Sequence, residues 1–258
     1  MSRCPPPEAG AQAGRRPAPR SAVPVPSIDQ SWALMLLPPV LSLIAGSCDI
    51  IGFIGLGGLF TAHITGNIVL LVAHIAAGAD APLSYMLSVP VFIVALVLSR
   101  YLVGALERRG MPSLRPLLLL QFLLLAVFLV LCAPASPVDP NAGKALLGCM
   151  LGVSAMAVQN ALVQVSITGA PATAVMTTNT TRFAMDLGEV LMAADRAQAS
   201  KAAIRARRTL PSIVAFVVGC GLGAGCQVII GLWSLLLPTA LAFVALGLAL
   251  GTRPAEAS

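Results

Sequence analysis

Long apolar stretches alternate with short polar ones along this chain of 258 residues. A helix crosses the hydrocarbon core of a bilayer with about 20 residues, and six stretches reach or approach that length. They cover residues 32–58, 84–104, 116–133, 145–167, 211–231 and 233–251, the last two divided by a turn near Gly231-Leu232. Two shorter apolar stretches cover residues 64–78 and 182–194. The pattern predicts an all-α integral membrane protein with about six transmembrane helices and two short re-entrant or half-membrane segments.

The composition also indicates a membrane location. Hydrophobic residues make up 57% of the chain and charged residues only 10%, against about 25% charged residues in a soluble domain. A net charge of +6 is compatible with a nucleic-acid partner, but the positive charges flank the apolar stretches, as topology signals do. We therefore expect this protein to lie in a lipid bilayer and to have no nucleic-acid partner.

The two ends of the chain differ from its apolar middle. Residues 1–30 are basic and rich in proline, which excludes regular structure for most of them. We expect a disordered tail over residues 1–30, a transmembrane domain over residues 31–252 and a short tail over residues 253–258.

The distribution of basic residues indicates which segments cross the membrane. Lysine and arginine cluster in the N-terminal tail, in residues 107–115 and 196–208, and at Arg253, whereas residues 79–83 and 134–143 contain neither. Six crossings with a cytoplasmic N-terminus place every basic cluster in the cytoplasm, and eight crossings do not. We therefore expect both termini in the cytoplasm, and both short segments to return to the side from which they enter.

A weak internal repeat relates the two halves of the chain. Residues 64–68 (ITGNI) align with residues 176–180 (MTTNT) at an offset of 112. The candidate repeats, residues 32–133 and 145–251, each contain three long stretches, with a short one after the first. Three crossings is an odd number, so the halves would have opposite orientations in the membrane, as in many secondary transporters.

The segment from Gly46 to Asn67 contains an unusual acidic residue. Asp49 lies within an apolar, glycine-rich stretch, where an ionised carboxylate costs about 2.5–3.5 kcal/mol by insertion scales. One interpretation is an ion- or proton-binding carboxylate on a solute pathway; the alternative is a structural carboxylate hydrogen-bonded to a neighbouring helix. His63 is the nearby group that can exchange a proton near neutral pH.

Thr65, Gly66 and Asn67 begin the first short segment. The N-terminus of a half-membrane helix exposes unpaired N–H groups and the positive end of the helix dipole, so it can receive an anionic group. Threonine and asparagine are also common helix caps, and the sequence leaves both roles open. At the offset of 112, Thr177 and Asn179 take the corresponding positions in the second half.

Two further sets of polar residues lie in the second half. Gln159 and Asn160 fall within the fourth long stretch, where their amides can bridge helices or contact a solute. Arg182, Asp186 and Glu189 share one face of the second short segment. We expect Arg182 to pair with Asp186 and to leave Glu189 less neutralised. The three residues form either a carboxylate relay opposite the first motif, or the polar face and internal salt bridges of an interfacial helix.

Other kinds of site are not indicated. Glycines at alternate positions from Gly219 to Gly225 lack the lysine and the strand–turn–helix context of a nucleotide loop, and their Gly-x-x-x-Gly spacing favours close helix packing. The six cysteines include no C-x-x-C pair, so neither a disulfide framework nor a zinc site is indicated. His63 and His74 lack an H-E-x-x-H pattern. We expect no metal and no cofactor.

The first-half motif resembles the signature of the YoaK family of bacterial inner-membrane proteins. The residues that carry the resemblance are Gly46, Asp49, Gly52, Phe53, Leu56, Gly57, Gly58, Phe60, Thr65, Gly66 and Asn67. In the second half, Gln159-Asn160 and Thr173…Met176-Thr177 are similar, although Thr177-Thr178-Asn179 stands where family members tend to show Thr-Gly-Thr. The resemblance implies a multi-pass protein of the bacterial inner membrane and no established activity.

These observations favour a function in membrane transport. The sequence contains no recognisable nucleophile–base constellation, so we do not expect an enzyme. We expect a secondary transporter or permease for a small polar or anionic solute, with Asp49 as the candidate for proton coupling. The alternative is a membrane scaffold, sensor or assembly partner that transports nothing, whose glycine-rich faces bind other proteins. A homo-oligomer is compatible with both.

Overall fold

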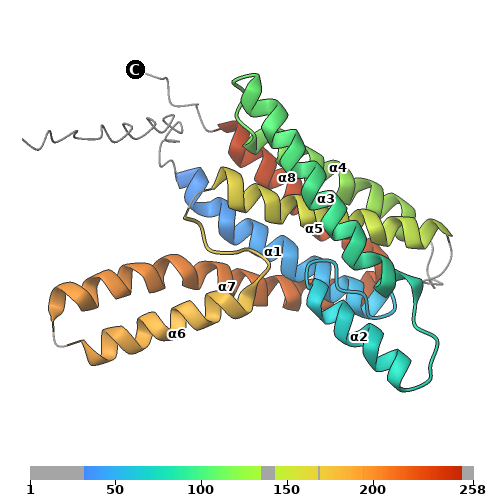
Figure 1. The fold of residues 1–258 in the computed structure, drawn as a ribbon, viewed down its shortest axis with the longest axis horizontal. Coiled ribbons are helices and arrows are strands. Elements are labelled where there is room, and N and C mark those ends of the chain that lie inside the picture. Colours follow the sequence, from blue (N-terminus) through green and yellow to red (C-terminus); the bar gives the residue numbers. More distant parts are fainter. Residues whose placement is uncertain (1–31, 135–142, 168, 194, 252–258) are drawn as a thin grey trace, which may run out of the picture. The chain divides into compact units, whose positions relative to one another are not determined.

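The computed structural model describes residues 32–134, 143–167, 169–193 and 195–251, which are helical with connecting loops and contain no strand (Figure 1). The helices are α1 (Trp32–Gly55), α2 (Ile64–Ala76), α3 (Leu83–Arg108), α4 (Leu114–Cys132), α5 (Gly143–Ser166), α6 (Met176–Met192), α7 (Arg196–Ile230), the 3₁₀ helix η1 (Gly231–Leu235) and α8 (Leu236–Gly251). The predicted all-α membrane protein is confirmed.

The long apolar stretches become long helices. Within the described residues, five helical stretches have the length and composition to cross a membrane, and the fifth extends from Arg196 to Gly251. Gly231, at φ +57°, begins η1 and divides this fifth stretch into α7 and α8. Each of the six predicted long stretches is therefore found in a helix, and the turn expected near Gly231-Leu232 is confirmed.

The two short segments form separate helices. At about 1.5 Å per residue, the 13 residues of α2 extend about 20 Å and the 17 residues of α6 about 25 Å, both less than the hydrocarbon core of about 30 Å. The predicted start of the second short segment at residue 182 is wrong, because α6 begins at Met176. Its threonine-rich first turns carry little hydrophobic signal, but packing of α6 against α7 supports a helix there.

The helix contacts of the two halves correspond. α1 packs against α7 and α8, while α5 packs against α3 and α4; α2 packs against α3, and α6 against α7. When α1–α4 are matched in order with α5–α8, each of these contacts has a counterpart. Met176 of α6 also lies 112 residues after Ile64 of α2, and α1 and α5 run in opposite directions in Figure 1.

The capping residues of the two short helices correspond as well. The cap of α2, His63, has φ −90° and ψ 70°, and the cap of α6, Val175, has φ −97° and ψ 77°. These two residues are related by the same offset. The chain therefore enters both short helices with nearly the same backbone conformation.

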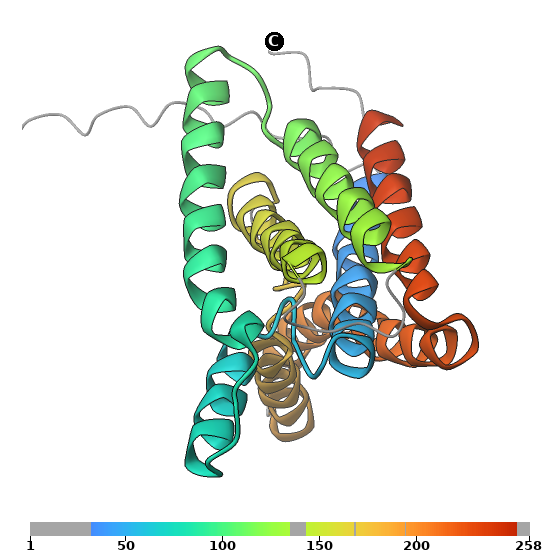
Figure 2. The same ribbon diagram turned by 90° about the vertical axis from the view of Figure 1, so that its right-hand side faces the viewer.

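Helix α5 occupies the centre of the described helices. Most of its side chains are buried, whereas few of those in α3 are. Figure 2 shows α5 nearly end-on, between α3 and α4. Gln159, the fully buried polar residue of α5, is therefore surrounded by protein and does not face lipid.

Three glycines allow α1 and α7 to pack closely. A Cβ atom on Gly46 would lie 2.3 Å from the carbonyl oxygen of Phe216, and one on Gly219 would lie 2.3 Å from that of Leu43. A Cβ atom on Gly223 would lie 2.6 Å from the side chain of Ile50. The expected Gly-x-x-x-Gly packing is confirmed for Gly219 and Gly223.

We expect Gly219→Ala to destabilise the protein, because the added methyl group presses on a backbone carbonyl of α1. Overpacking of this kind costs about 1–3 kcal/mol. Gly221→Ala is the matched control: a Cβ atom there meets nothing within 4 Å, and alanine favours the helix by about 1 kcal/mol. Thermal unfolding of the two purified variants in one detergent measures the difference. Equal midpoints would contradict the close packing described here.

Candidate functional site

The loop between α1 and α2 turns back toward α1. Gly57 and Gly58 have φ angles of 72° and 88°, in the region that glycine adopts without strain. A Cβ atom on Gly52 would lie 2.6 Å from the carbonyl oxygen of Leu59, so glycine at this position lets the returning chain approach α1. Residues 61–63 thereby reach the side chain of Asp49.

Asp49 receives hydrogen bonds from three groups of this loop. Its Oδ1 accepts from the backbone N–H of Ala62 at 2.7 Å and from Oγ1 of Thr61 at 3.2 Å, and its Oδ2 lies 2.6 Å from Nδ1 of His63. The residue is only 3% exposed. A buried carboxylate needs such partners. These partners lie in the loop after its own helix, so the alternative expectation of a bond to a neighbouring helix is wrong.

His63 connects this carboxylate to a more exposed environment. Its side chain is 37% exposed, and its ring lies 5.9 Å from each of the rings of Phe60 and Phe216, measured between centroids. The bond to Asp49 uses Nδ1, and Nε2 has no hydrogen-bond partner within the described part of the chain. A carboxylate–imidazole pair with one free ring nitrogen can hold a proton and exchange it.

Asn67 closes the loop onto itself. Its Oδ1 accepts from the N–H of Phe60 at 2.9 Å, and its Nδ2 donates to the carbonyl oxygen of the same residue at 2.7 Å. The side chain is fully buried. Asn67 therefore does not cap α2, and the cap residue His63 makes no side-chain capping bond.

The remaining residues of this motif have different roles. Thr65 is exposed and does not contribute to the hydrogen-bonded loop. Gly66 provides space: a Cβ atom there would lie 2.9 Å from the ring of Phe60. Of the two roles that the sequence left open, helix capping is therefore wrong for Asn67, because its side chain bonds the preceding loop.

The loop before α6 carries a related arrangement. Asn179 Nδ2 donates to the carbonyl oxygen of Ala172, and these two residues are the counterparts of Asn67 and Phe60 at the offset of 112. Thr173, the counterpart of Thr61, accepts a hydrogen bond from Nε2 of Gln159 at 3.0 Å. Thr177 is exposed on the surface of α6.

Gln159 is the centre of a buried amide network. Besides Thr173, its Nε2 donates to the carbonyl oxygen of Leu41 in α1 at 2.9 Å, and its Oε1 accepts from Nε2 of Gln121 in α4 at 2.7 Å. Both glutamines are fully buried. The expected helix-bridging amide is confirmed for Gln159, but not for Asn160, whose Nδ2 donates to the carbonyl oxygen of Met156 in its own helix.

Sequence analysis missed Gln121. It is the one uncharged polar residue in the otherwise apolar stretch of residues 116–133, and that isolation was a usable signal. Its Oε1 is buried without a hydrogen-bond partner among the described residues. The network therefore has one free acceptor at the centre of the helices.

The charged residues of α6 pair differently from the expectation. Arg205 of α7 bonds both acids: its Nε lies 2.7 Å from Oδ1 of Asp186, and its Nη2 lies 2.5 Å from Oε2 of Glu189. The predicted pair between Arg182 and Asp186 is wrong, and Glu189 is not the less neutralised acid. The planar guanidinium of Arg205 reaches both carboxylates from the adjacent helix, and Arg182 remains exposed.

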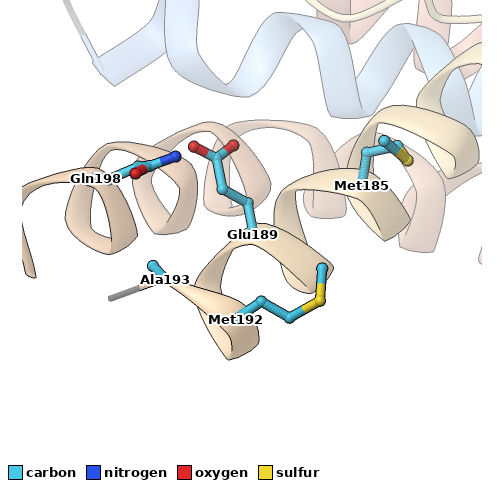
Figure 3. Close-up of a pocket in the computed structure, with 5 residues that line it drawn as sticks. All are labelled: Met185, Glu189, Met192, Ala193 and Gln198. Carbon is cyan, nitrogen blue, oxygen red and sulfur yellow. The ribbon is translucent and has the colours of Figure 1, made fainter. Parts of the chain in front are cut away.

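This ion cluster belongs to α6 and α7 only. Glu189 also lines an open hollow beside Met185, Met192, Ala193 and Gln198 (Figure 3). The ion pairs of Asp186 and Glu189 stay within the two helices and do not reach Asp49. The structure thus brings together Asp49, His63 and the first loop, and separately Gln159, Asn179 and the second loop.

Comparison with known proteins identifies similarity over most of the chain. The family model described as a protein of unknown function (DUF1275) matches residues 37–248. The UPF0700 transmembrane protein YoaK of Bacillus subtilis (strain 168) is 37% identical over 75 residues, or 29% of this chain and 33% of the relative. The alignment therefore spans about a third of the length of this curated relative. No solved structure matches. The resemblance expected from the first-half motif is confirmed.

We expect Asp49→Asn to preserve the fold and Asp49→Leu to destabilise it. The asparagine oxygen can still accept from Thr61 and Ala62, whereas leucine leaves both donors buried without a partner, at about 1–3 kcal/mol each. The yield of monodisperse protein and the thermal unfolding midpoint in detergent measure the effect. A leucine variant as stable as the asparagine variant would mean that the carboxylate does not hold the loop.

Proposed function

The chain belongs to the DUF1275 family of proteins of unknown function, and from its geometry we propose that it is a secondary transporter or permease for a small polar or anionic solute. One observation carries this proposal. Two units, each made of a long helix, a returning loop and a short helix, hold buried polar groups at corresponding places. Non-helical backbone at membrane depth is tolerated where it packs on protein or lines a hydrated path.

The two units support the proposal of an inverted repeat. α1 and α5 run in opposite directions (Figure 1), and each packs against helices of the other half. Secondary transporters with this design expose a central site alternately to each side when one half rocks against the other. The two loops would then be equivalent gates of the central site. We call the loop before α2, closed by Asn67, the carboxylate gate, and the loop before α6, closed by Asn179, the amide gate.

Distances along the helices suggest where the gates lie in the membrane. Asp49 precedes the end of α1 by six residues, or about 9 Å of helix, and Gln159 precedes the end of α5 by seven, or about 10 Å. If both termini are cytoplasmic, the end of α1 is outside and the end of α5 is inside. The carboxylate gate then faces the outer side, and the amide gate faces the cytoplasm.

Proton coupling belongs to the carboxylate gate. Asp49 and His63 form the pair that can bind a proton, and the exposed part of His63 gives it a route to solvent. The amides of Gln159 and Gln121 cannot ionise, but they can hydrogen-bond a polar solute through the free Oε1 of Gln121. The proposal therefore assigns coupling to the first half and solute contact to the centre.

Transport in vesicles tests the proposal. We expect the purified protein, reconstituted and screened with a panel of small organic acids and polar solutes, to show counterflow of at least one of them. Asp49→Asn and His63→Gln should lower uptake of that solute under an imposed proton gradient at least tenfold, because each removes one member of the proton-binding pair.

His74→Gln is the matched control for this assay. His74 bonds the carbonyl oxygen of Leu70 in its own helix and lies against Tyr85, so its loss should leave the flux unchanged. Uptake under a proton gradient that the Asp49 variant retains would exclude the coupling role. A protein without flux that copurifies with a stoichiometric partner would instead be a scaffold or assembly partner.

Topology gives a separate test of the inverted repeat. After replacement of the native cysteines, we expect Asp80→Cys and Lys144→Cys to react with a membrane-impermeant thiol reagent from the outside, and Gly110→Cys from the cytoplasm. This pattern follows if α2 returns to the side from which it enters. Labelling of position 80 from the cytoplasm only would show that α2 crosses, and the repeat would not be inverted.

A further inference from the structure

The hairpin formed by α6 and the first part of α7 has an excess of positive charge on its surface. In Figure 1 these two helices run side by side and extend away from α3, α4 and α8. Asp186 and Glu189, the acids of α6, are both bound by Arg205 between the two helices. The other basic residues of the hairpin are exposed: Arg182, Arg196, Lys201, Arg207 and Arg208. None of these five has an ion-pair partner among the described residues.

The basic residues of α7 lie next to its apolar part. The helix continues without interruption from Arg196 to Ile230, and the residues after Pro211 form an apolar stretch of about the length that crosses a bilayer. Arg207 and Arg208 precede that stretch by about one helical turn, or about 5 Å. If that stretch crosses the bilayer, they lie at the depth of the lipid headgroups.

The outward face of α7 carries this charge. Ala202, Ala206 and Thr209 are buried on one face of the helix, whereas Lys201 and Arg208 are exposed on the other. At 100° per residue, these two cations share the outer side of the hairpin. A positively charged surface beside an apolar stretch favours binding of a negatively charged partner.

The second half of α6 exposes large apolar side chains. Met185, Leu191 and Met192 are 73%, 77% and 82% exposed. Figure 3 shows Met185 and Met192 on α6, while Glu189 points toward α7. Exposed methionine and leucine beside lysine and arginine is typical of helices that lie in the membrane interface.

We propose that this hairpin docks on anionic phospholipid headgroups at the membrane surface. Lys201, Arg207 and Arg208 bind the phosphate groups, and Met185, next to the Asp186 that Arg205 binds, is the exposed methionine of α6 that lies nearest to the acyl chains. The internal ion cluster on Arg205 makes this possible, because it keeps both acids of α6 away from the lipid phosphates. The inference does not depend on transport activity.

Lipid retention by the purified full-length chain tests the proposal. The probes are phosphatidylglycerol and phosphatidylcholine, added to the protein in detergent and counted by native mass spectrometry. We expect the wild type to retain phosphatidylglycerol preferentially. The triple variant Lys201→Gln, Arg207→Gln, Arg208→Gln should bind it at least tenfold more weakly and bind phosphatidylcholine as before.

The matched control removes two cations from another helix end. Arg108 and Arg109 are exposed at the end of α3, next to the exposed acid Glu107, so Arg108→Gln with Arg109→Gln should change phosphatidylglycerol binding little. An equal loss in this control would mean that total charge, and not the hairpin, decides binding. A wild type without preference for the anionic lipid would overturn the proposal.

Two further measurements on the wild type keep the test independent of the folding of the triple variant. Raising the salt concentration from 0.1 M to 0.5 M should weaken phosphatidylglycerol retention severalfold, because salt screens exposed charges. Inorganic phosphate at millimolar concentration should not displace the lipid. Displacement by phosphate would indicate a free-anion site, and displacement by a short RNA would indicate a nucleic-acid surface; either result would overturn docking on the bilayer.

Discussion

The carboxylate of Asp49 determines where the chain can go after α1. A buried carboxylate must find donors, and here every donor belongs to residues 61–63. The loop therefore returns along α1, which places the start of α2 beside that helix. Asn67 then joins the first turns of α2 to the backbone of Phe60. A single buried charge thus organises a helix, a loop and a half-length helix into one unit.

This unit depends on close packing around it. α1 can bring Asp49 into the interior because Gly46, Gly219 and Gly223 let it lie directly on the backbone of α7. Helices in lipid gain little from the hydrophobic effect, so such contacts carry much of the association energy. The Sγ atom of Cys220, in α7, lies 3.4 Å from the carbonyl oxygen of Gly46. The polar loop and the glycine contact therefore meet the same stretch of α1, and the ring of Phe216 in α7 lies against His63 of the loop.

Much of the architecture could be predicted from the sequence, because lipid imposes strong and simple requirements on chain segments. The lengths of the apolar stretches predicted the long helices, and glycine spacing predicted the packing of α7. The pairing of polar side chains could not be predicted in the same way. Arg182 and Asp186 are four residues apart on one helix, yet Arg205 of α7 takes the carboxylate. The spacing of residues within one helix does not reveal which side chain of a neighbouring helix will bond them.

The same limit applies to the motif residues. Asn67 and Thr65 looked alike as helix caps, but only the fold reveals that the loop passes close enough for Asn67 to bond Phe60. Asp49 was recognisable because an ionised carboxylate costs free energy in lipid. Gln121 carries no charge, so a leucine-rich stretch that contains it still reads as an ordinary apolar span. Ionised groups in apolar segments can thus be found from sequence alone, while neutral amides need the structure to reveal their partners.

The two halves share a backbone design but differ in the chemistry of their polar groups. The loop before α2 is held by an ionisable carboxylate, and the loop before α6 by the neutral amide of Gln159. A carboxylate and an imidazole can bind a proton, whereas a neutral amide cannot. Under the proposed function, only the loop before α2 therefore carries side chains that a proton can bind, namely Asp49 and His63.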